Sequence, residues 1–162
     1  MLRYFVILLL INGILIYADA QTTVSDSLKN KLSGLSESDS FDFLIDQCQH
    51  FLGKDQETGL FCAHLALKYA NKLNDEEKLC KAKFYKGAYF VQSGNLDSAI
   101  QLLSGSVQLA VQNKNKKMQL TSLDALGNAF LRSGKVDSAK IIYDNVIIIS
   151  DTLTAFLPYK QN

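Results

Sequence analysis

The sequence predicts an all-α protein built as a solenoid of antiparallel helix hairpins. Two stretches, 87–99 and 127–139, repeat one another at a spacing of 40 residues, since 127 corresponds to 87 and 139 to 99. A period of this length is typical of stacked units that are each too small to bury their own apolar face. Apolar residues recur at helical spacing, and the one proline, Pro158, leaves long helices uninterrupted.

Residues 1–20 have the pattern of an export signal. Arg3 supplies positive charge, 5–17 is an apolar run, and 18–20 (Ala-Asp-Ala) is a small-x-small cleavage site before Gln21. The apolar run is shorter than the roughly 20 residues of a membrane-spanning helix. We therefore expect cleavage, an exported periplasmic or extracellular protein, and no membrane span in the mature chain.

A polar lead-in, 21–40, is expected next. Leu28, Leu32 and Leu35 are spaced i, i+4, i+7 and predict a short amphipathic helix. Gly34 and the Ser/Asp cluster that follows it are expected to end that helix.

Three helix hairpins are predicted over 41–75, 76–114 and 115–150, followed by a C-terminal tail over 151–162. The six expected helices run over 41–52, 56–73, 76–92, 96–112, 117–132 and 136–150. Asp55 and Asn95 are predicted N-caps, and either Asp39 or Ser40 is expected to cap the first helix. Gly94 and Gly134 are predicted left-handed stops.

Two glycines lie inside predicted helices, where each costs about 1 kcal/mol relative to Ala. Gly87 and Gly127 occupy the same register of successive repeats. This recurrence predicts a neighbouring helix that passes too close for a Cβ atom. We expect Ala99 and Ala139 to supply the matching small surface on the partner helix of each hairpin.

Small-residue helix pairs with an aromatic residue three positions after the glycine (Phe90, Phe130) resemble the tetratricopeptide repeat (TPR). The resemblance covers about 41–150 and is best in the third repeat, whereas the second has Lys86 where the family usually has Leu. It implies a TPR-like superhelix. The long unit resembles a variant found in exported sensor regions of bacterial histidine kinases and of some helix-turn-helix regulators.

In this family the first helix of each hairpin lines a concave groove, so the resemblance implies a protein-binding surface. The positions carried over include Lys81 and Val91, and the principal groove residues are Phe84, Ala88, Gln92, Asp124, Asn128 and Arg132. An amide at position 128 can both donate to and accept from a peptide backbone. The alternative is a solvated polar face in which residues spaced i, i+4 interact with one another.

Chemistry-bearing residues are sparse. The formal net charge of +1 provides no basic field for nucleic acid. His50 and His64 have no Ser, Cys or carboxylate partner at catalytic spacing, so we expect no enzyme activity, no cofactor and no metal. The three cysteines, Cys48, Cys62 and Cys80, are expected in the core, and a Cys48–Cys62 disulfide is the alternative.

The last predicted helix is apolar around most of its circumference. The residues concerned are Ile141, Ile142, Val146, Ile147, Ile148 and Ile149. Such a helix needs cover on both sides. We therefore expect an apolar edge that docks the tail (Leu153, Phe156, Leu157), a second copy, or sequence further downstream.

The sequence thus predicts a non-catalytic repeat protein that binds a peptide or protein segment, as a scaffold or as a sensory module. The alternative is the N-terminal sensory region of a bacterial signal-transduction protein, a histidine kinase or transcriptional regulator, whose output domain lies outside this chain.

Overall fold

A computed structural model describes residues 26–155, and this part of the chain is entirely helical outside its turns. A short helix at 26–32 precedes six longer ones. These are α2 (Glu37–Phe51), α3 (Gln56–Leu73), α4 (Glu76–Ser93), α5 (Leu96–Gln112), α6 (Lys116–Arg132) and α7 (Val136–Ala155). The chain divides into two compact units after Ser36. The predicted signal peptide and the residues after 155 lie outside the described range, in which no helix has the length and apolarity needed to cross a bilayer.

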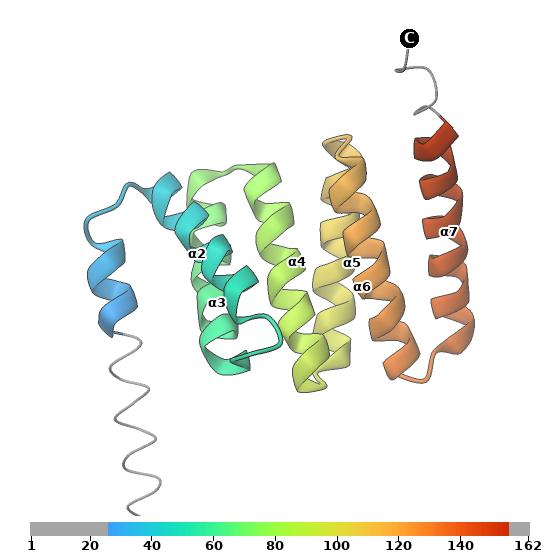
Figure 1. Cartoon of the computed structure of the whole chain (residues 1–162), viewed down its shortest axis with the longest axis horizontal. Coiled ribbons are helices and arrows are strands. Elements are labelled where there is room, and N and C mark those ends of the chain that lie inside the picture. Colours follow the sequence, from blue (N-terminus) through green and yellow to red (C-terminus); the bar gives the residue numbers. More distant parts are fainter. Residues whose placement is uncertain (1–25, 156–162) are drawn as a thin grey trace, which may run out of the picture. The chain divides into compact units, whose positions relative to one another are not determined.

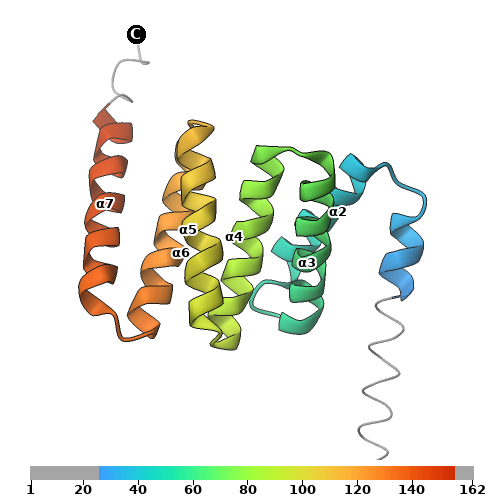
Figure 2. The same cartoon turned by 180° about the vertical axis from the view of Figure 1, so that it is seen from behind.

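The six helices of the second unit stand side by side as a row of antiparallel hairpins (Figure 1). Each helix packs on its neighbours in the chain, and the first helices of successive hairpins also touch, α2 with α4 and α4 with α6. In Figure 1, α2 and α6 lie in front of α3 and α5, and Figure 2 shows the reverse. The first helices therefore gather on one face and the second helices on the other, which is the arrangement of an all-α solenoid.

The two outermost helix boundaries differ from the prediction. Helix α2 begins at Glu37, four residues before the predicted start at 41, so neither Asp39 nor Ser40 is its cap. Glu37 and Asp39 lie in the first turn of α2, where negative side chains are stabilised by the positive end of the helix dipole. The Ser/Asp cluster therefore begins a helix, whereas the sequence predicted that it ends one. Helix α7 continues to Ala155 instead of ending near 150, because its last turn contains neither Gly nor Pro.

The turns between helices use short-range side-chain and backbone signals. The Asp55 side chain accepts a hydrogen bond from the Thr58 backbone N–H, as predicted, whereas Asn95 stands at the N-cap of α5 without a capping hydrogen bond. Gly94 and Gly134 have φ angles of 79° and 77°, the left-handed conformation predicted for these stops. The sequence therefore predicted the positions of these turns correctly, but it wrongly predicted a capping hydrogen bond for Asn95.

The helix glycines do face partner helices, but the partners are not the predicted alanines. A Cβ on Gly87 would come within 2.7 Å of Leu103, and one on Gly127 within 2.8 Å of the Tyr143 ring. A third contact follows the same rule between hairpins, where a Cβ on Gly59 would overlap the Tyr89 hydroxyl. The prediction that Ala99 and Ala139 oppose Gly87 and Gly127 is wrong, because a large side chain fills the space that each glycine leaves.

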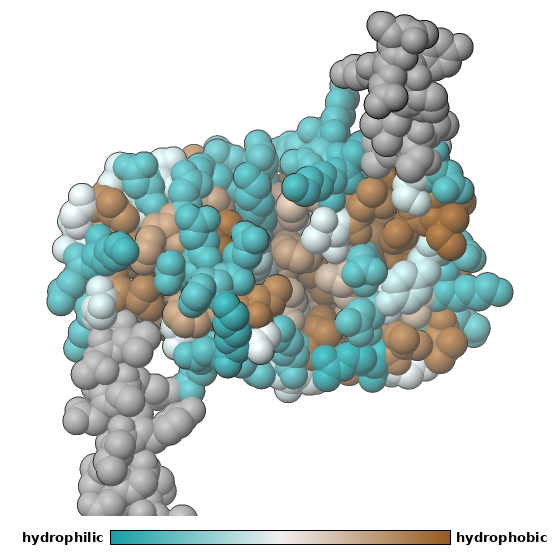
Figure 3. Space-filling view, viewed as in Figure 1, coloured by the Kyte–Doolittle hydropathy of each residue, from teal (hydrophilic) through white to brown (hydrophobic). Residues whose placement is uncertain are grey.

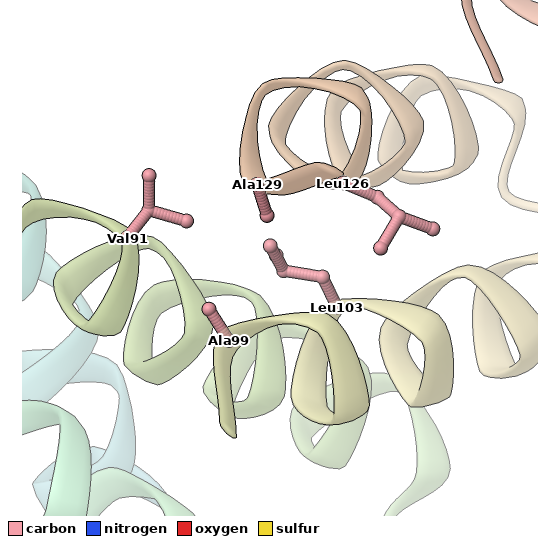
Figure 4. Packing of buried hydrophobic residues seen from close by; sticks show 5 residues of the cluster. All are labelled: Val91, Ala99, Leu103, Leu126 and Ala129. Atoms are coloured by element: carbon pink, nitrogen blue, oxygen red, sulfur yellow. The ribbon is translucent and has the colours of Figure 1, made fainter. Parts of the chain in front are cut away.

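The expected packing alanines instead belong to the core. Ala99 is fully buried and forms a cluster with Val91, Leu103, Leu126 and Ala129, which joins α4, α5 and α6 (Figure 4). In Figure 4, Ala99 of α5 points into the space between Val91 and Ala129, and Leu103 of α5 points toward Ala129 of α6. This cluster fixes the second hairpin on the third.

A buried polar chain crosses the same three helices. Ser106 of α5 donates from its Oγ to the Cys80 carbonyl of α4 at 2.9 Å, and its Oγ also lies 2.9 Å from the Ser122 hydroxyl of α6. The Cys80 thiol donates in return to the Ser106 carbonyl at 3.2 Å. The two hydroxyls are buried, but their hydrogen bonds offset the cost of desolvation. Because hydrogen bonds depend on geometry, they fix the relative positions of the three helices.

The short helix at 26–32 belongs to the other compact unit. Leu28 and Leu32 are buried, as expected for the apolar side of an amphipathic helix. Leu35 is exposed and follows the end of the helix, so it does not extend that stripe.

Candidate functional site

The candidate site is the face of the second unit where the first helices gather. Helix α4 contributes three of the predicted groove residues to it. Phe84 and Ala88 are partly buried, and Gln92 is exposed. The Phe84 ring packs on the core cluster and contacts Tyr85 edge to face, with ring centroids 5.1 Å apart. Phe84 therefore forms the floor of this surface more than its lining.

Helix α6 presents the exposed part of the site. Asp124, Asn128 and Arg132 are spaced i, i+4, i+8 and are all exposed on the same side of the helix. Asn128 and Asp124 supply an amide and a carboxylate that can hydrogen-bond to a peptide. This row is the part of the predicted groove with exposed polar groups.

Arg132 has a second role that the sequence did not reveal. Its guanidinium Nη1 donates to the backbone carbonyl of Val91, near the end of α4. That carbonyl belongs to the last turn of a helix, where the partial negative charge of the dipole favours a cation. Arg132 thus ties the third hairpin to the second, and no local pattern in the sequence signals this contact.

Positions that correspond in successive repeats become more exposed from the first hairpin to the third. Leu44 on α2 is fully buried, Phe84 on α4 is partly buried, and Asp124 on α6 is exposed. Cys48, Ala88 and Asn128, 40 residues apart, follow the same order. The accessible surface at these positions therefore lies on α4 and α6.

Two further groove positions have other partners. Lys81 forms an ion pair with Glu77 one turn earlier, with 3.0 Å between Nζ and Oε1. Val91 is 6% exposed and belongs to the core cluster, so it does not line a groove. The family register alone therefore overstates the extent of the surface.

The three cysteines are free thiols and are all buried. Burial raises the pKa of Cys48 far above its usual range, and the neighbouring Cys62 raises it further. Burial, with a contribution from Asp55, raises the pKa of Cys62 to about 11. Thiols with raised pKa values are poor nucleophiles and poor metal ligands near neutral pH, which agrees with a packing role.

The histidines have different surroundings. His50 stacks edge to face on Phe51, with centroids 5.0 Å apart. His64 is exposed, and its Nδ1 lies 3.4 Å from the Lys86 ammonium. Over residues 26–155, no group of three His, Cys, Asp or Glu side chains is arranged to hold a metal ion.

Sequence reasoning also missed the role of Tyr89. Its ring is fully buried over Gly59, and its hydroxyl donates to the Cys48 carbonyl at 2.6 Å. Ala99 and Ala129 stand 40 residues after Gly59 and Tyr89, so the repeat contained the signal. One repeat has Gly59 and Tyr89 where the next has two alanines, so a smaller residue at one position accompanies a larger residue at the other. Such compensating sizes indicate that the two positions are neighbours.

Comparison with known proteins supports the fold. The chain is similar to the TPR domain of Arabidopsis FLU, with a TM-score of 0.67 and 20% sequence identity. The match covers 72% of this chain and 99% of the FLU domain. No protein-family model matches the sequence, and no curated protein matches it. The chain is therefore a helical repeat protein with the TPR fold.

Proposed function

We propose that this protein is a non-catalytic scaffold that binds a peptide or protein segment across α4 and α6. The TPR fold typically serves protein–protein interaction, and the similarity to the FLU domain supports that general role here. The observation that carries the proposal is the exposed Asp124–Asn128 row on α6, which contacts α4, the helix that carries the partly buried Phe84 and Ala88. An apolar floor with a polar edge matches the anatomy of peptide-binding surfaces.

A site-specific crosslinking experiment tests the proposal. A photoreactive residue at position 128 should capture a protein segment that the same residue at Gln108 does not, since Gln108 is exposed on α5. The captured segment, made as a peptide, should then bind Asn128→Ala about 5- to 30-fold more weakly, which corresponds to 1–2 kcal/mol. Equal binding by wild type and Asn128→Ala, with unchanged helicity, would remove the groove assignment.

Arg132 is not a clean probe of this surface. Replacing it with Ala removes its hydrogen bond to the Val91 carbonyl as well as any ligand contact. We expect Arg132→Ala to lower both stability and affinity, so Asn128 and Asp124 are the better test positions.

We further propose that α7 pairs with a second copy of the chain. Ile141, Ile147 and Ile148 are 62%, 56% and 61% exposed, and apolar surface gathers at the α7 end of the row in Figure 3. Ile141 and Ile148 are seven residues apart, the spacing by which two helices share a seam. Lys140 and Asp144, both exposed, border this stripe with opposite charges, so the face is partly complementary to itself.

The oligomeric state tests this pairing. Light scattering of the wild-type protein after size exclusion should give a dimer mass that becomes monomeric in Ile141→Gln/Ile148→Gln. Gln is the residue that the repeat has at both positions in α5, Gln101 and Gln108. A monomeric wild type at high micromolar concentration would overturn the proposal.

We also propose that the protein is exported, on the basis of the pattern in residues 1–20. N-terminal sequencing of the protein from the producing cell should start at Gln21. A start at Met1 would contradict export. The sensory role and the alternative of a signalling front region rest on the sequence resemblance described above.

A further inference from the structure

Two lysines of α4 occupy positions where the next hairpin buries leucine. Lys83 and Lys86 stand 40 residues before Leu123 and Leu126 of α6. The two leucines are 5% and 4% exposed, and Leu126 belongs to the core cluster. The lysines are only partly buried. Helix α4 therefore has two positive charges at the positions where α6 has two core leucines.

Both lysines reach a second helix of a hairpin, Lys83 toward α5 and Lys86 toward α3. Helices α3 and α5 flank α4 in Figure 2. The Lys83 side chain crosses the α5 backbone at Gly105, where an added Cβ would lie 3.0 Å from its Nζ. The Lys86 Nζ points toward α3 and lies 3.4 Å from Nδ1 of His64. Helix geometry places Lys83 about 140° and Lys86 about 160° around α4 from Ala88, and thus away from the candidate groove.

The charge on this side is not neutralised within the described residues. The other lysines of α4 have carboxylate partners, since Lys78 pairs with Asp42 at 3.1 Å and Lys81 with Glu77. Across residues 26–155, no carboxylate pairs with Lys83 or Lys86, nor with Lys68, which follows His64 by one turn on α3. Helix α5 contributes a single acid, Asp97, which lies 3.9 Å from Lys135 of the next hairpin.

Partly buried ammonium groups without a counter-ion are unfavourable, and leucine at these positions would bury apolar area instead. The Lys86 ammonium does lie over the Phe90 ring, 5.8 Å from its centroid, but this contact offsets only part of the cost and adds no negative charge. Within the described residues, the fold therefore supplies no counter-ion for either lysine. An external anion would compensate their charge.

We propose that Lys68, Lys83 and Lys86, with His64, form a second binding surface that recognises an acidic segment of a partner protein. This basic surface lies on the back of the stack and is separate from the proposed groove. Lys83 extends toward α5 and Lys86 toward α3, so the two ammonium groups do not converge on one point. A single phosphate cannot contact groups that diverge in this way, whereas successive carboxylates along a chain can.

The test compares two double variants of the full chain that lose the same charge. Lys83→Leu/Lys86→Leu introduces the residues that the third hairpin has at these positions. Lys54→Gln/Lys114→Gln removes two exposed lysines that lie in turns elsewhere. A short oligoglutamate peptide at low ionic strength should bind the wild type and the second variant equally. It should bind the leucine variant about tenfold more weakly or worse.

The leucine variant should also unfold at a higher temperature than the wild type. A structural role for the lysines predicts the reverse, so this second measurement distinguishes a binding role from a packing role. Higher stability combined with weaker peptide binding supports the proposal.

Four results would overturn it: no oligoglutamate binding by wild type at low salt, equal weakening in both variants, tighter binding of a short single-stranded oligonucleotide, or full competition by inorganic phosphate at equimolar concentration. Asn128→Ala should bind oligoglutamate as the wild type does. Failure of the groove proposal therefore leaves this one testable, and the reverse also holds.

Discussion

At the scale of single residues, three helix contacts share one rule, in which a glycine on one helix accepts a large side chain from the next. The pairs are Gly59 with Tyr89, Gly87 with Leu103 and Gly127 with Tyr143. Leu103 and Tyr143 are themselves 40 residues apart, so the second and third hairpins close in the same way. Packing at native density makes such contacts sensitive to one added methyl group.

Gly59→Ala should destabilise the protein by about 2 kcal/mol or more, because the new Cβ would overlap the buried Tyr89 ring. Gly105→Ala is the matched control, since its Cβ would meet only the flexible end of Lys83. We expect the control to be neutral or stabilising by up to about 1 kcal/mol through helix propensity. Urea unfolding followed by circular dichroism measures both, and an unchanged midpoint for Gly59→Ala would contradict the contact.

Tyr89→Phe isolates the hydroxyl of the same residue. The ring should stay in place, and the buried Cys48 carbonyl should lose the hydrogen bond that it accepts at 2.6 Å. The expected cost is about 1 kcal/mol of unfolding free energy. Tyr143→Phe, with a far more exposed ring, should change the urea midpoint little. A larger loss of stability in Tyr143→Phe than in Tyr89→Phe would contradict a stabilising role for the Tyr89 hydroxyl.

At the scale of helices, the N-termini differ in how their free N–H groups are satisfied. The side chains of Asp55 and Asp75 accept from the Thr58 and Lys78 backbone N–H groups, at 3.1 and 3.0 Å. Asn95, in the equivalent place before α5, makes no such bond. Of these three Asp or Asn residues at helix N-termini, two therefore form a capping hydrogen bond and one does not.

Asp55→Ala and Asp75→Ala should each cost about 1 kcal/mol, whereas Asn95→Ala should cost a few tenths at most. Thermal or urea unfolding of the three variants gives the comparison. The hydrogen bonds from Thr58 lower the pKa of Asp55, so its contribution is present above the unfolded-state value near 4 and is lost as the pH falls through the folded value. Equal costs for all three variants would contradict the capping assignment.

At the scale of the whole molecule, the core buries thiols and phenols in their neutral forms. Burial raises the pKa values of Cys48, Cys62, Cys80 and Tyr89, and for Cys62 the value reaches about 11. The unfolded chain loses these protons near pH 9 for Cys, so above that pH the unfolded state binds fewer protons than the folded one. Stability therefore falls as the pH rises.

We expect the free energy of unfolding, measured with a reductant present, to be lower at pH 10.5 than at pH 7.5. Cys62→Ala should reduce this alkaline loss, because the substitution removes one of the buried groups that titrate. A flat profile from pH 7.5 to 10.5 would contradict the burial of neutral thiols. The Cys48–Cys62 disulfide considered from the sequence is absent, since both thiols are free.

The 40-residue period was enough to predict the architecture from the sequence. It locates hairpins because Gly94 and Gly134 end the first helices of successive hairpins, and the predicted bounds of α3 and α5 are those observed. Local signals of this kind depend on backbone geometry within a few residues, so they can be read without a tertiary structure. They fail at α2 and α7, where the chain has no repeat to compare on one side.

The candidate site could be predicted only in part. The helix face that carries Asp124 and Asn128 follows from helical spacing, and both residues are exposed as expected for a surface. The bond from Arg132 to the Val91 carbonyl joins residues 41 positions apart, and it depends on how two hairpins stack. Helical spacing within one element contains no information about that distance.

The sequence by itself determined that this protein is a stack of helix pairs, and it located the turns between them. Only the tertiary structure decided which side chain fills each glycine, which polar residues join hairpins, and that Lys83 and Lys86 remain without a carboxylate within residues 26–155. The physical reason is that helix formation and capping depend on neighbours in sequence. Packing and charge compensation depend on distances between helices, which form only when the hairpins come together.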